Sequence, residues 1–344
     1  MESFRLPAEW EEQDAVLLIW PHAATDWQPV LPEVNRVYIA MLSAIAQSER
    51  VLIVTPEAHS LSHRLAFFMP ALMKNITLVD LPTNDTWARD CAPISLVSTL
   101  PATAGILLDF GFNGWGGKFP ARLDNLITRR LCERGLFTAV WRDCLDFVLE
   151  GGSIDTDGQG TLLTTARCLL NPNRNPHLSQ ALIEQRLKDG LGINRILWLH
   201  HGALLGDDTD GHVDMLARFV APDAIAYTAC DDPSYPCYNE LKLMESELRS
   251  FRTTTGEAYT LLPLPLAPTG DGLPASYTNF LITNTAVVLP DYGDEGINTI
   301  AQTLQSAFPT RSIIPIPARP LLRQGGSIHC STMQIPKGFL NTNH

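Results

Sequence analysis

The sequence predicts an α/β protein with many short strands, and two patterns carry this prediction. Short runs rich in β-branched residues recur along the chain, most of them close to Pro, Gly, Asn or Asp, as is typical of strands. Between them lie segments whose apolar residues recur every three or four positions, as on one face of a helix. Alternation of the two patterns is typical of α/β folds. Hydrophobic residues make up 45% and charged residues 18% of the 344, which is a globular composition.

The strand predictions follow the β-branched runs in chain order. They cover residues 51–54, 76–79, 105–110, 161–165, 196–199, 213–220, 225–228, 286–289 and 312–316. One helix is predicted from an apolar face made of Val34, Val37, Tyr38, Met41 and Ile45. A second helix is predicted behind a candidate N-cap at Asp294, from the apolar face of Ile297, Ile300, Ala301, Leu304 and Phe308.

The chain is predicted to form a single domain over residues 1–344. Its length is large for one ordinary domain and small for two large ones, but it is enough to bury a sizeable core. No segment is a convincing linker, because the Pro- and Gly-rich stretch 262–274 is interpreted as one long loop. Short identities point to an internal repeat, namely Gly-Gly-Ser-Ile at 151–154 and 325–328 and Asp-Thr at 85–86 and 208–209.

Charge and hydropathy disfavour two classes of partner. The 37 acidic and 25 basic residues give a formal net charge of −12, and phosphate contacts need Lys and Arg, so nucleic-acid binding is not expected. An acidic surface attracts small cations instead. The N-terminal residues lack the features of a signal peptide, and the longest apolar runs, such as 15–20, are too short to span a bilayer. We therefore expect a cytoplasmic protein with no membrane partner.

The seven cysteines are scattered along the chain, and no Cys-x-x-Cys occurs, so neither a zinc ribbon nor a thioredoxin motif is indicated. An odd number of cysteines without a signal peptide indicates free thiols in a reducing compartment. One of them is a candidate nucleophile. The alternative for each is a buried thiol that packs as a small hydrophobic side chain.

Polar segments punctuated by glycine stand out against the apolar background. Most of them lie near a predicted strand, where rigid scaffolds usually present functional groups. They are residues 84–90, 112–117, 150–153, 206–214 and 325–330.

Cys330 is the first candidate within these segments. It closely follows Gly325 and Gly326, and glycine leaves room for a substrate. A distant histidine such as His212 could serve as its base. His329 is not expected to do so, because neighbours in a strand face opposite ways. From spacing alone, a buried structural thiol is the stronger interpretation of Cys330.

His212 and Asp214 form the second candidate pair. In a strand, residues i and i+2 face the same side, so the imidazole and the carboxylate would project together into one pocket. A surface loop with turn-forming aspartates is one alternative. A metal site is another, because the segment is dense in ligand atoms, from Asp207, Asp208, Asp210, His212 and Asp214. The EF-hand pattern fails here, since Gly206 and Ala217 would fall at its first and twelfth positions.

Two further carboxylates and two tryptophans lie in the same segments. Glu150 and Asp90, taken singly, are more typical of capping or surface groups. Trp87 and Trp115 would normally belong to a core, but a tryptophan in a glycine-rich loop can offer its face to a cation.

Together these segments resemble the agmatine deiminase family, within the larger group of guanidine-modifying enzymes. Related members are labelled peptidylarginine deiminases. The resemblance implies a five-bladed, pseudo-symmetric α/β propeller of the pentein type, built of ββαβ units around a central active site. Gly114 departs from the pattern, because many members have alanine there, and residues 118–124 also differ. The matching segments run nearly the whole chain, at 7–10, 84–90, 112–117, 149–154, 164–171, 206–214, 276–280 and 325–334.

The resemblance also implies roles for seven residues. The catalytic set would be Cys330 as nucleophile, His212 as general acid and base, Glu150 as the carboxylate that supports the histidine and substrate, and Asp90 with Asp214 as the pair that grips the guanidinium. Trp87 would form a wall of the substrate pocket, and Trp115 is a second candidate for such a wall.

The implied chemistry suits these residue types. A guanidinium presents its donors in a planar fork that paired carboxylates match. The thiolate attacks the central carbon, the histidine protonates the departing ammonia, and the same histidine then activates water to hydrolyse the S-alkylthiouronium. The expected reaction converts agmatine to N-carbamoylputrescine, a step towards putrescine and polyamine biosynthesis. No metal or organic cofactor is expected.

Four alternatives remain open from the sequence. They are a peptidylarginine deiminase, a free-arginine deiminase, an amidinotransferase and a non-catalytic guanidinium-binding module. Free arginine would need a cation to receive its carboxylate. Arg89 is expected to face away from Asp90, which leaves Lys118 as a candidate. The expected partner is a small cationic guanidine, and a homo-oligomer is compatible with the sequence.

Overall fold

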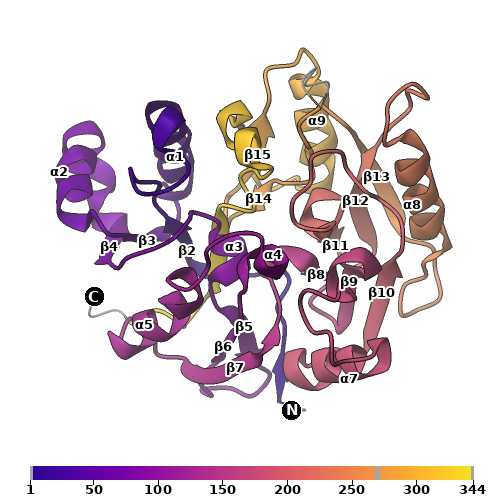
Figure 1. Ribbon diagram of the computed structural model, residues 1–344, viewed down its shortest axis with the longest axis horizontal. Coiled ribbons are helices and arrows are strands. Elements are labelled where there is room, and N and C mark those ends of the chain that lie inside the picture. The colour runs from indigo at the N-terminus through magenta and orange to yellow at the C-terminus, as the bar shows by residue number, and fades with distance from the viewer. Residues whose placement is uncertain (1–2, 268–271, 342–344) are drawn as a thin grey trace.

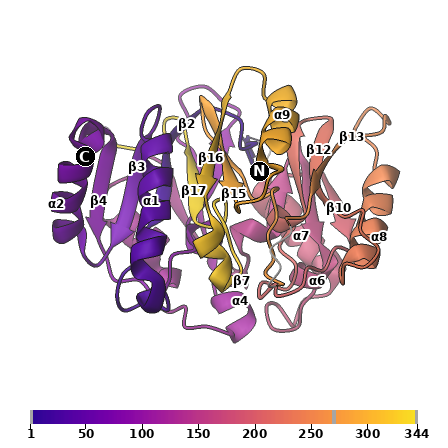
Figure 2. The same cartoon turned by 90° about the horizontal axis from the view of Figure 1, so that it is seen from above.

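The computed structural model describes residues 3–267 and 272–341 and confirms the α/β class (Figure 1). In this part of the chain the strands form five sheets of three or four strands each. Figure 1 places the longer helices at the periphery and the short helices α3 (Ala88–Cys91) and α4 (Gly114–Gly117) near the middle. Figure 2 shows the same arrangement from above, with α2 (Ala58–Phe68) and α8 (Tyr238–Ser250) at opposite ends.

Each sheet contains the same unit, in which two antiparallel strands are followed by a helical connection to a parallel strand. The first sheet has the order β17 (Thr332–Pro336), β2 (Gln13–Ile19), β3 (Arg50–Thr55), β4 (Ile76–Asp80), and its helices are α1 (Leu31–Ile45) and α2. The second has the order β1 (Phe4–Arg5), β5 (Ile94–Ser98), β6 (Ile106–Gly111), β7 (Val140–Val148), with α4 and α5 (Ile127–Glu133) between β6 and β7.

The other three sheets have three strands each. The third has the order β10 (Arg195–Leu199), β9 (Thr161–Thr165), β8 (Ile154–Thr156), with helices α6 (Ala166–Leu169) and α7 (Gln180–Leu191). The fourth consists of β11 (Ala217–Ala221), β12 (Ala224–Ala229), α8 and β13 (Thr260–Pro265). The fifth consists of β14 (Leu281–Ile282), β15 (Ala286–Asp291), α9 (Ile297–Ala307) and β16 (Ser312–Pro317).

Local sequence explains these elements. Strand β2 lies inside its sheet, and its residues from Ala15 to Ile19 are fully buried, as expected of a strand covered on both faces. Helix α7 begins at Ser179, whose hydroxyl accepts a hydrogen bond from the Leu182 amide, and ends at Gly192 in the left-handed conformation. A Cβ at Gly192 would lie 2.2 Å from the carbonyl oxygen of Phe4, so glycine is required there.

Most of the predicted elements are confirmed. Eight of the nine predicted strands match observed strands to within one or two residues at each end. Both predicted helices are present, as α1 and α9. Strand β2 was not predicted, because its continuous apolar run lacks the alternation of a half-buried strand.

Three predictions are wrong in detail. The segment 213–220 is not one strand, because Val213–Met215 form a 3-10 helix (η5) and β11 begins only at Ala217. The segment 262–274 is not one loop, because β13 extends to Pro265 at a sheet edge, where proline is tolerated; residues 268–271 lie outside the described residues. Asp294 does not cap α9, which begins after Gly296, and instead accepts a hydrogen bond from the Gly296 amide at 2.6 Å.

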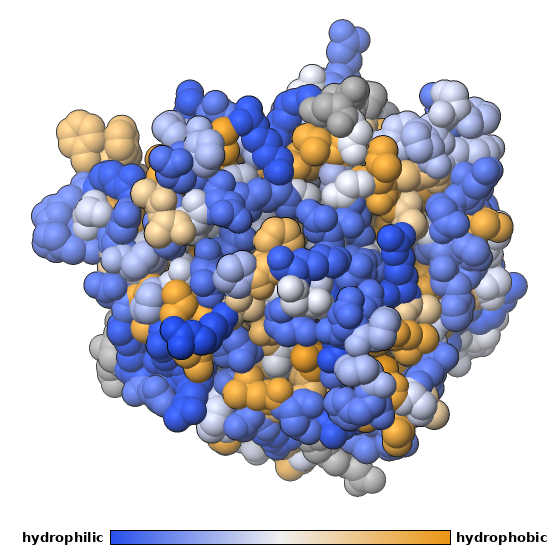
Figure 3. Space-filling model, in the orientation of Figure 1, coloured by the Kyte–Doolittle hydropathy of each residue, from blue (hydrophilic) through white to orange (hydrophobic). Residues whose placement is uncertain are grey.

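The face of the molecule seen in Figure 1 is predominantly polar. Figure 3 shows a mostly hydrophilic face with scattered hydrophobic residues. None of the helices in the described part of the chain has both the length and the apolar character needed to cross a bilayer.

Candidate active site

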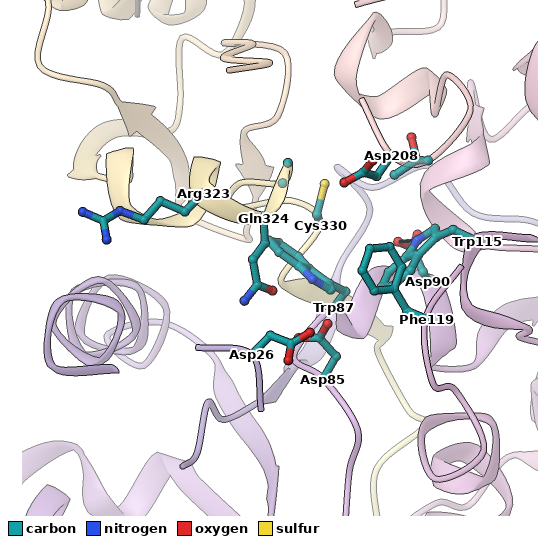
Figure 4. A pocket seen from close by; sticks show the side chains of 13 residues that line it. Asp26, Asp85, Trp87, Asp90, Trp115, Phe119, Asp208, Arg323, Gln324 and Cys330 are labelled. Carbon is teal, nitrogen blue, oxygen red and sulfur yellow. Dashed lines mark hydrogen bonds between the residues drawn. The ribbon is translucent and has the colours of Figure 1, made fainter. Parts of the chain in front are cut away.

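A pocket of about 160 Å³ lies where several of the polar segments meet. Residues of 84–90, 112–117, 206–214 and 325–330 all contribute to its wall, although they are far apart in sequence. In Figure 4, Cys330 and Asp208 lie on one side and Asp26 and Asp85 on the other. The lining residues are Asp26, Asp85, Trp87, Asp90, Trp115, Phe119, Asp208, Thr209, Arg323, Gln324, Gly325, Gly326 and Cys330.

Cys330 presents a buried thiol to this pocket. The Asn279 amide group donates a hydrogen bond to Sγ at 3.1 Å, and the Asn279 carbonyl accepts one from the Cys330 backbone amide at 3.2 Å. Sγ also lies 3.5 Å from Asp214 Oδ2. Burial raises the pKa of Cys330 well above its usual value, and the charges of Asp214 and Asp90 add to this. A cation bound nearby would therefore be needed to favour the thiolate.

His212 lies between two carboxylates. Its Nδ1 is 3.5 Å from Asp90 Oδ1, and its Nε2 is 3.5 Å from Glu150 Oε2. The ring is fully buried, and neither nitrogen has a hydrogen-bond partner among the described residues. Burial opposes its charge, but Asp90, Cys168 and Glu150 together raise the pKa of His212 well above its ordinary value. The charged form of the imidazole is therefore favoured, and it can give a proton to a leaving group.

Asp90 is held by two donors. Its Oδ1 accepts a hydrogen bond from the Gly152 amide at 3.0 Å, and its Oδ2 accepts one from Trp115 Nε1 at 2.9 Å. Burial raises the pKa of Asp90 to about 6, because the opposing effect of His212 is smaller.

Trp115 reaches Asp90 from a left-handed backbone conformation, with φ of 55°. At the preceding Gly114, a Cβ would lie 2.1 Å from the Phe119 carbonyl oxygen, so alanine would not fit this backbone.

Asp214 is held from behind by a histidine. Its Oδ2 lies 2.8 Å from His329 Nδ1, and His329 Nε2 lies 2.7 Å from Glu9 Oε2. Burial opposes ionisation of Asp214, but the hydrogen bond and charge of His329 outweigh it and lower the pKa of Asp214. Its Oδ1 is buried and has no partner among the described residues. This oxygen is therefore free to accept a hydrogen bond from a ligand.

Glu150 is fixed by a buried ion pair. Its Oε2 accepts a hydrogen bond from Arg174 Nε at 2.7 Å, while Oε1 has no partner within the described segments. Arg174 also donates to Asp210 Oδ2 and to the Thr209 carbonyl oxygen, each at 2.8 Å. Through Arg174, these contacts connect Glu150 to the aspartate-rich loop of residues 206–214.

Two aspartates of this loop bind groups of the loop itself or cations beside it. Asp207 accepts hydrogen bonds from the Thr209 and Gly211 amides, at 2.9 and 2.6 Å, as turn-forming aspartates do. Asp210 pairs with Lys118 and Arg174, each at 2.8 Å. Both side chains therefore stabilise the loop.

Five of the predicted residues come together around Gly152. A Cβ on this glycine would lie 2.6 Å from His212 Nδ1, 2.8 Å from Asp90 Oδ1 and 3.2 Å from Asp214 Oδ2. Cys330 and Glu150 join the group through the contacts of Asp214 and His212. The strand argument for His212 and Asp214 is wrong, because the chain enters η5 directly after His212. The two side chains nevertheless converge.

The two tryptophans occupy different places. Trp87 lines the pocket and packs over Gly326, where an added Cβ would lie 2.4 Å from its ring. Trp115 also lines the pocket, and its indole N–H is bound to Asp90. Trp115 therefore forms part of the pocket wall and also orients the Asp90 carboxylate.

Several residues of the site were not predicted. His329 contacts Asp214 and Glu9 rather than the Cys330 thiol, in line with the expectation that it is not the base, but the reason given was wrong, because residues 328–330 form a turn and not a strand. Asn279 and Glu9 lie within segments of the family resemblance, at 276–280 and 7–10, but were given no role. Arg89 does point away from Asp90, towards Glu9 and Gln334, because it lies on helix α3 rather than in an extended segment.

Gly152→Ala is expected to lower kcat/KM by about 100-fold, because displacing catalytic groups by about 1 Å typically has an effect of this size. The added methyl group would displace His212, Asp90 or Asp214 from their present positions. Gly190→Ala on α7 is the matched control, since a Cβ there meets nothing within 4 Å. Steady-state ammonia release measures both variants. A fully active Gly152→Ala would show that these groups need not occupy their present positions.

Comparison with known proteins gives one consistent family. Residues 5–336 match the model of the Porphyromonas-type peptidyl-arginine deiminases. A structure from Porphyromonas gingivalis described as a candidate arginine deiminase is 46% identical, with a TM-score of 0.92, covering 98% of this chain and 100% of that one. A C. jejuni agmatine deiminase with substrate bound is 37% identical, with a TM-score of 0.88 and 97% of each chain covered. A candidate agmatine deiminase of Vibrio parahaemolyticus is 37% identical, again with 97% of each covered.

Proposed function

The chain belongs to the Porphyromonas-type peptidyl-arginine deiminase family, and from this we propose that it is an agmatine deiminase. It is a hydrolase that acts on a C–N bond of a guanidinium and releases ammonia, with N-carbamoylputrescine as the other product. Relatives named as agmatine deiminases over nearly the whole chain support this function. The observation that carries it is a buried thiol and an acidic wall on one pocket, with the His212 imidazole 3.5 Å from Asp90.

In the proposed ground state, the substrate guanidinium binds between Asp90 and Asp214. The free Oδ1 of Asp214 can accept one of its N–H groups, and carboxylate oxygens of Asp90 can accept more than one donor each. The bound positive charge offsets the burial that keeps the Cys330 thiol protonated. Binding of the substrate therefore favours the thiolate, and the thiol proton passes to solvent because the charged form of His212 cannot accept it.

The proposed reaction then has two halves. The thiolate attacks the central carbon and an S–C bond forms; the C–N bond to the departing nitrogen breaks as His212 gives up its proton, and ammonia leaves. Water then gives a proton to His212 and attacks the thiouronium carbon. The S–C bond breaks with its electron pair going to sulfur, and the hydroxyl proton of the adduct passes to that sulfur, which leaves the neutral ureido product and the Cys330 thiol. Glu150 favours the protonated form of His212 at the start of each cycle.

The charges of the pocket favour agmatine over free arginine. Of the described lining residues, Asp26, Asp85, Asp90 and Asp208 are acidic, whereas Arg323 alone is cationic. Figure 4 shows the Arg323 guanidinium turned away from Cys330, and it lies 3.6 Å from Glu33.

The other two candidate cations are also engaged. Lys118 donates to the Asp208 carbonyl oxygen and to Asp210, and Arg89 faces Glu9. An ammonium on the side of the pocket away from Cys330 would meet Asp26 and Asp85 (Figure 4). Burial raises the pKa of Asp85 to about 7, so a bound ammonium would favour its charged form, and an α-carboxylate would not.

Agmatine is expected to have a higher kcat/KM than free arginine or a blocked arginine peptide, measured by ammonia release on the same preparation. Asp85→Asn should raise KM for agmatine about tenfold, which is the lower end of the effect of losing a hydrogen bond to a charged group, worth about 1.5–3 kcal/mol. The asparagine keeps an oxygen for the Thr86 amide, which Asp85 now binds at 2.8 Å.

n-Butylguanidine is the matched control, because it has the same guanidinium but no ammonium, and its KM should not change in Asp85→Asn. Equal or faster turnover of arginine or of the peptide would defeat the agmatine assignment and favour the sister activity. It would leave the deiminase reaction standing.

We also propose that residues 1–344 form one catalytic domain in which the five sheets are the blades of a pentein-type propeller around the pocket. Support comes from the unit of two antiparallel strands, a helix and a parallel strand that recurs in all five sheets. A cytoplasmic location and a role in putrescine formation complete the proposal, and the seven free thiols fit a reducing compartment.

A further inference from the structure

Directly behind the pocket, three buried side chains of different chemistry meet. They are Glu150, Cys168 and His212, and one ligand atom of each lies within 4.8 Å of the other two. Glu150 Oε2 is 3.5 Å from His212 Nε2 and 3.7 Å from Cys168 Sγ. The three residues come from separate segments: Cys168 lies in α6, Glu150 follows β7 by two residues, and His212 directly precedes η5.

This cluster has unused hydrogen-bonding capacity. Both nitrogens of His212 and the Oε1 atom of Glu150 are buried and make no hydrogen bond in the described residues, although the two nitrogens lie 3.5 Å from carboxylates of Asp90 and Glu150. Buried polar atoms are nearly always paired, so three unpaired ones in one place indicate a site for something else. Cys168 has no part in the proposed reaction, although it is fully buried beside the histidine.

The donor set and its spacing suit zinc. Zinc in proteins is bound by cysteine, histidine and carboxylate at about 2.0–2.3 Å, so the ligand atoms of a tetrahedral site lie roughly 3.3–3.8 Å apart. The two measured separations, 3.5 and 3.7 Å, fall within this range. A thiolate with an imidazole favours zinc over magnesium or calcium, which prefer oxygen ligands.

We propose that Glu150, Cys168 and His212 form a binding site for Zn²⁺ whose occupation switches the enzyme off. The metal would replace one proton on the His212 imidazolium and one on the Cys168 thiol, so no redox change is involved. His212 could then neither protonate the departing nitrogen nor activate water. The cluster lies next to the pocket, because Asp90 lines the pocket and is 3.5 Å from His212. Binding is independent of the proposed deiminase function, whereas inhibition rests on it.

Cobalt titration tests the site itself. Co²⁺ added to chelator-treated protein should give one equivalent of a near-ultraviolet thiolate-to-cobalt absorption band. The band should persist in Cys330→Ser and disappear in Cys168→Ser. Cys144→Ser is the matched control for a half-buried thiol elsewhere, and it should keep the band. Absence of any band, or a band lost in Cys330→Ser but kept in Cys168→Ser, would overturn the proposal.

Activity measurements test the switch. Chelator-treated enzyme should keep full activity, added Zn²⁺ should inhibit it, and chelator should restore it. Cys168→Ser, compared with its own metal-free rate, should need at least about tenfold more Zn²⁺ for half-inhibition. Equal sensitivity of Cys168→Ser, or a cobalt band without inhibition, would refute the switch. If metal-free enzyme released no ammonia from any guanidine, the proposed function would fail, and the cobalt titration would still decide the site.

Discussion

Cys330→Ser is expected to lower ammonia release by on the order of 10⁴-fold or more, the scale seen when a nucleophile is removed from an enzyme that acts through a covalent intermediate. A serine hydroxyl ionises far less readily than a thiol, even with a guanidinium beside it. The fold should be retained, because the contact of the backbone amide with Asn279 and the small volume of the side chain are unchanged.

Cys230→Ser provides the control for removing a buried thiol, since Cys230 is also buried but lies outside the pocket. It should keep activity near that of the parent. His212→Asn should complete neither half of the reaction, because the departing nitrogen then has no proton donor and water has no base. If Cys330→Ser retained activity within tenfold of the parent, covalent catalysis by this residue would be excluded.

The class of fold was accessible from the sequence because it depends on local patterns. The apolar period of α1 and the β-branched runs of β3 and β12 each report on a single element. Strand β13 was missed because its prolines are normally turn signals, and only its position at a sheet edge makes them acceptable. That position depends on residues far away in the sequence.

The residues of the site could be named from the family resemblance, whereas their arrangement in space could not be predicted from the sequence. Cys330 alone is indistinguishable from a structural thiol. The direction of a side chain in a glycine-rich segment depends on whether the segment is extended or forms a turn. The sequence analysis assumed an extended segment at His329, and the contact of His329 with Asp214 was therefore not predicted. Arg174 carries no signal, because only the fold brings it to Glu150 across the intervening residues.

Burial of charge explains why these supporting residues are needed. Glu9 is fully buried, and His329, Arg218 and Arg89 lower its pKa below its usual range despite the effect of burial. Arg218 lies 2.8 Å from Glu9, and its guanidinium also packs over the ring of Phe280. Since an unpaired buried charge is costly, this network keeps Asp214 ionised at a position that water does not reach.

Asp90→Asn is expected to lower kcat/KM by roughly 30-fold to several thousand-fold, because losing one partner of a buried charge pair typically costs about 2–5 kcal/mol. The substitution removes the charge that faces the substrate guanidinium. It also has a second effect, because both oxygens of Asp90 accept N–H donors, from Gly152 and from Trp115. An asparagine can accept from only one of them and would place its own amide group against the other.

A double variant separates the two effects. Trp115→Phe removes the indole N–H and keeps an aromatic side chain in the pocket wall. In this background, the amide group of Asp90→Asn no longer faces the indole N–H. If charge is what Asp90 contributes, Asp90→Asn should still lower kcat/KM at least about 30-fold relative to Trp115→Phe alone. Recovery to the level of Trp115→Phe would mean that the single variant fails through the clash with the indole. In that case Asp214, with its free Oδ1, would be the residue that holds the guanidinium charge.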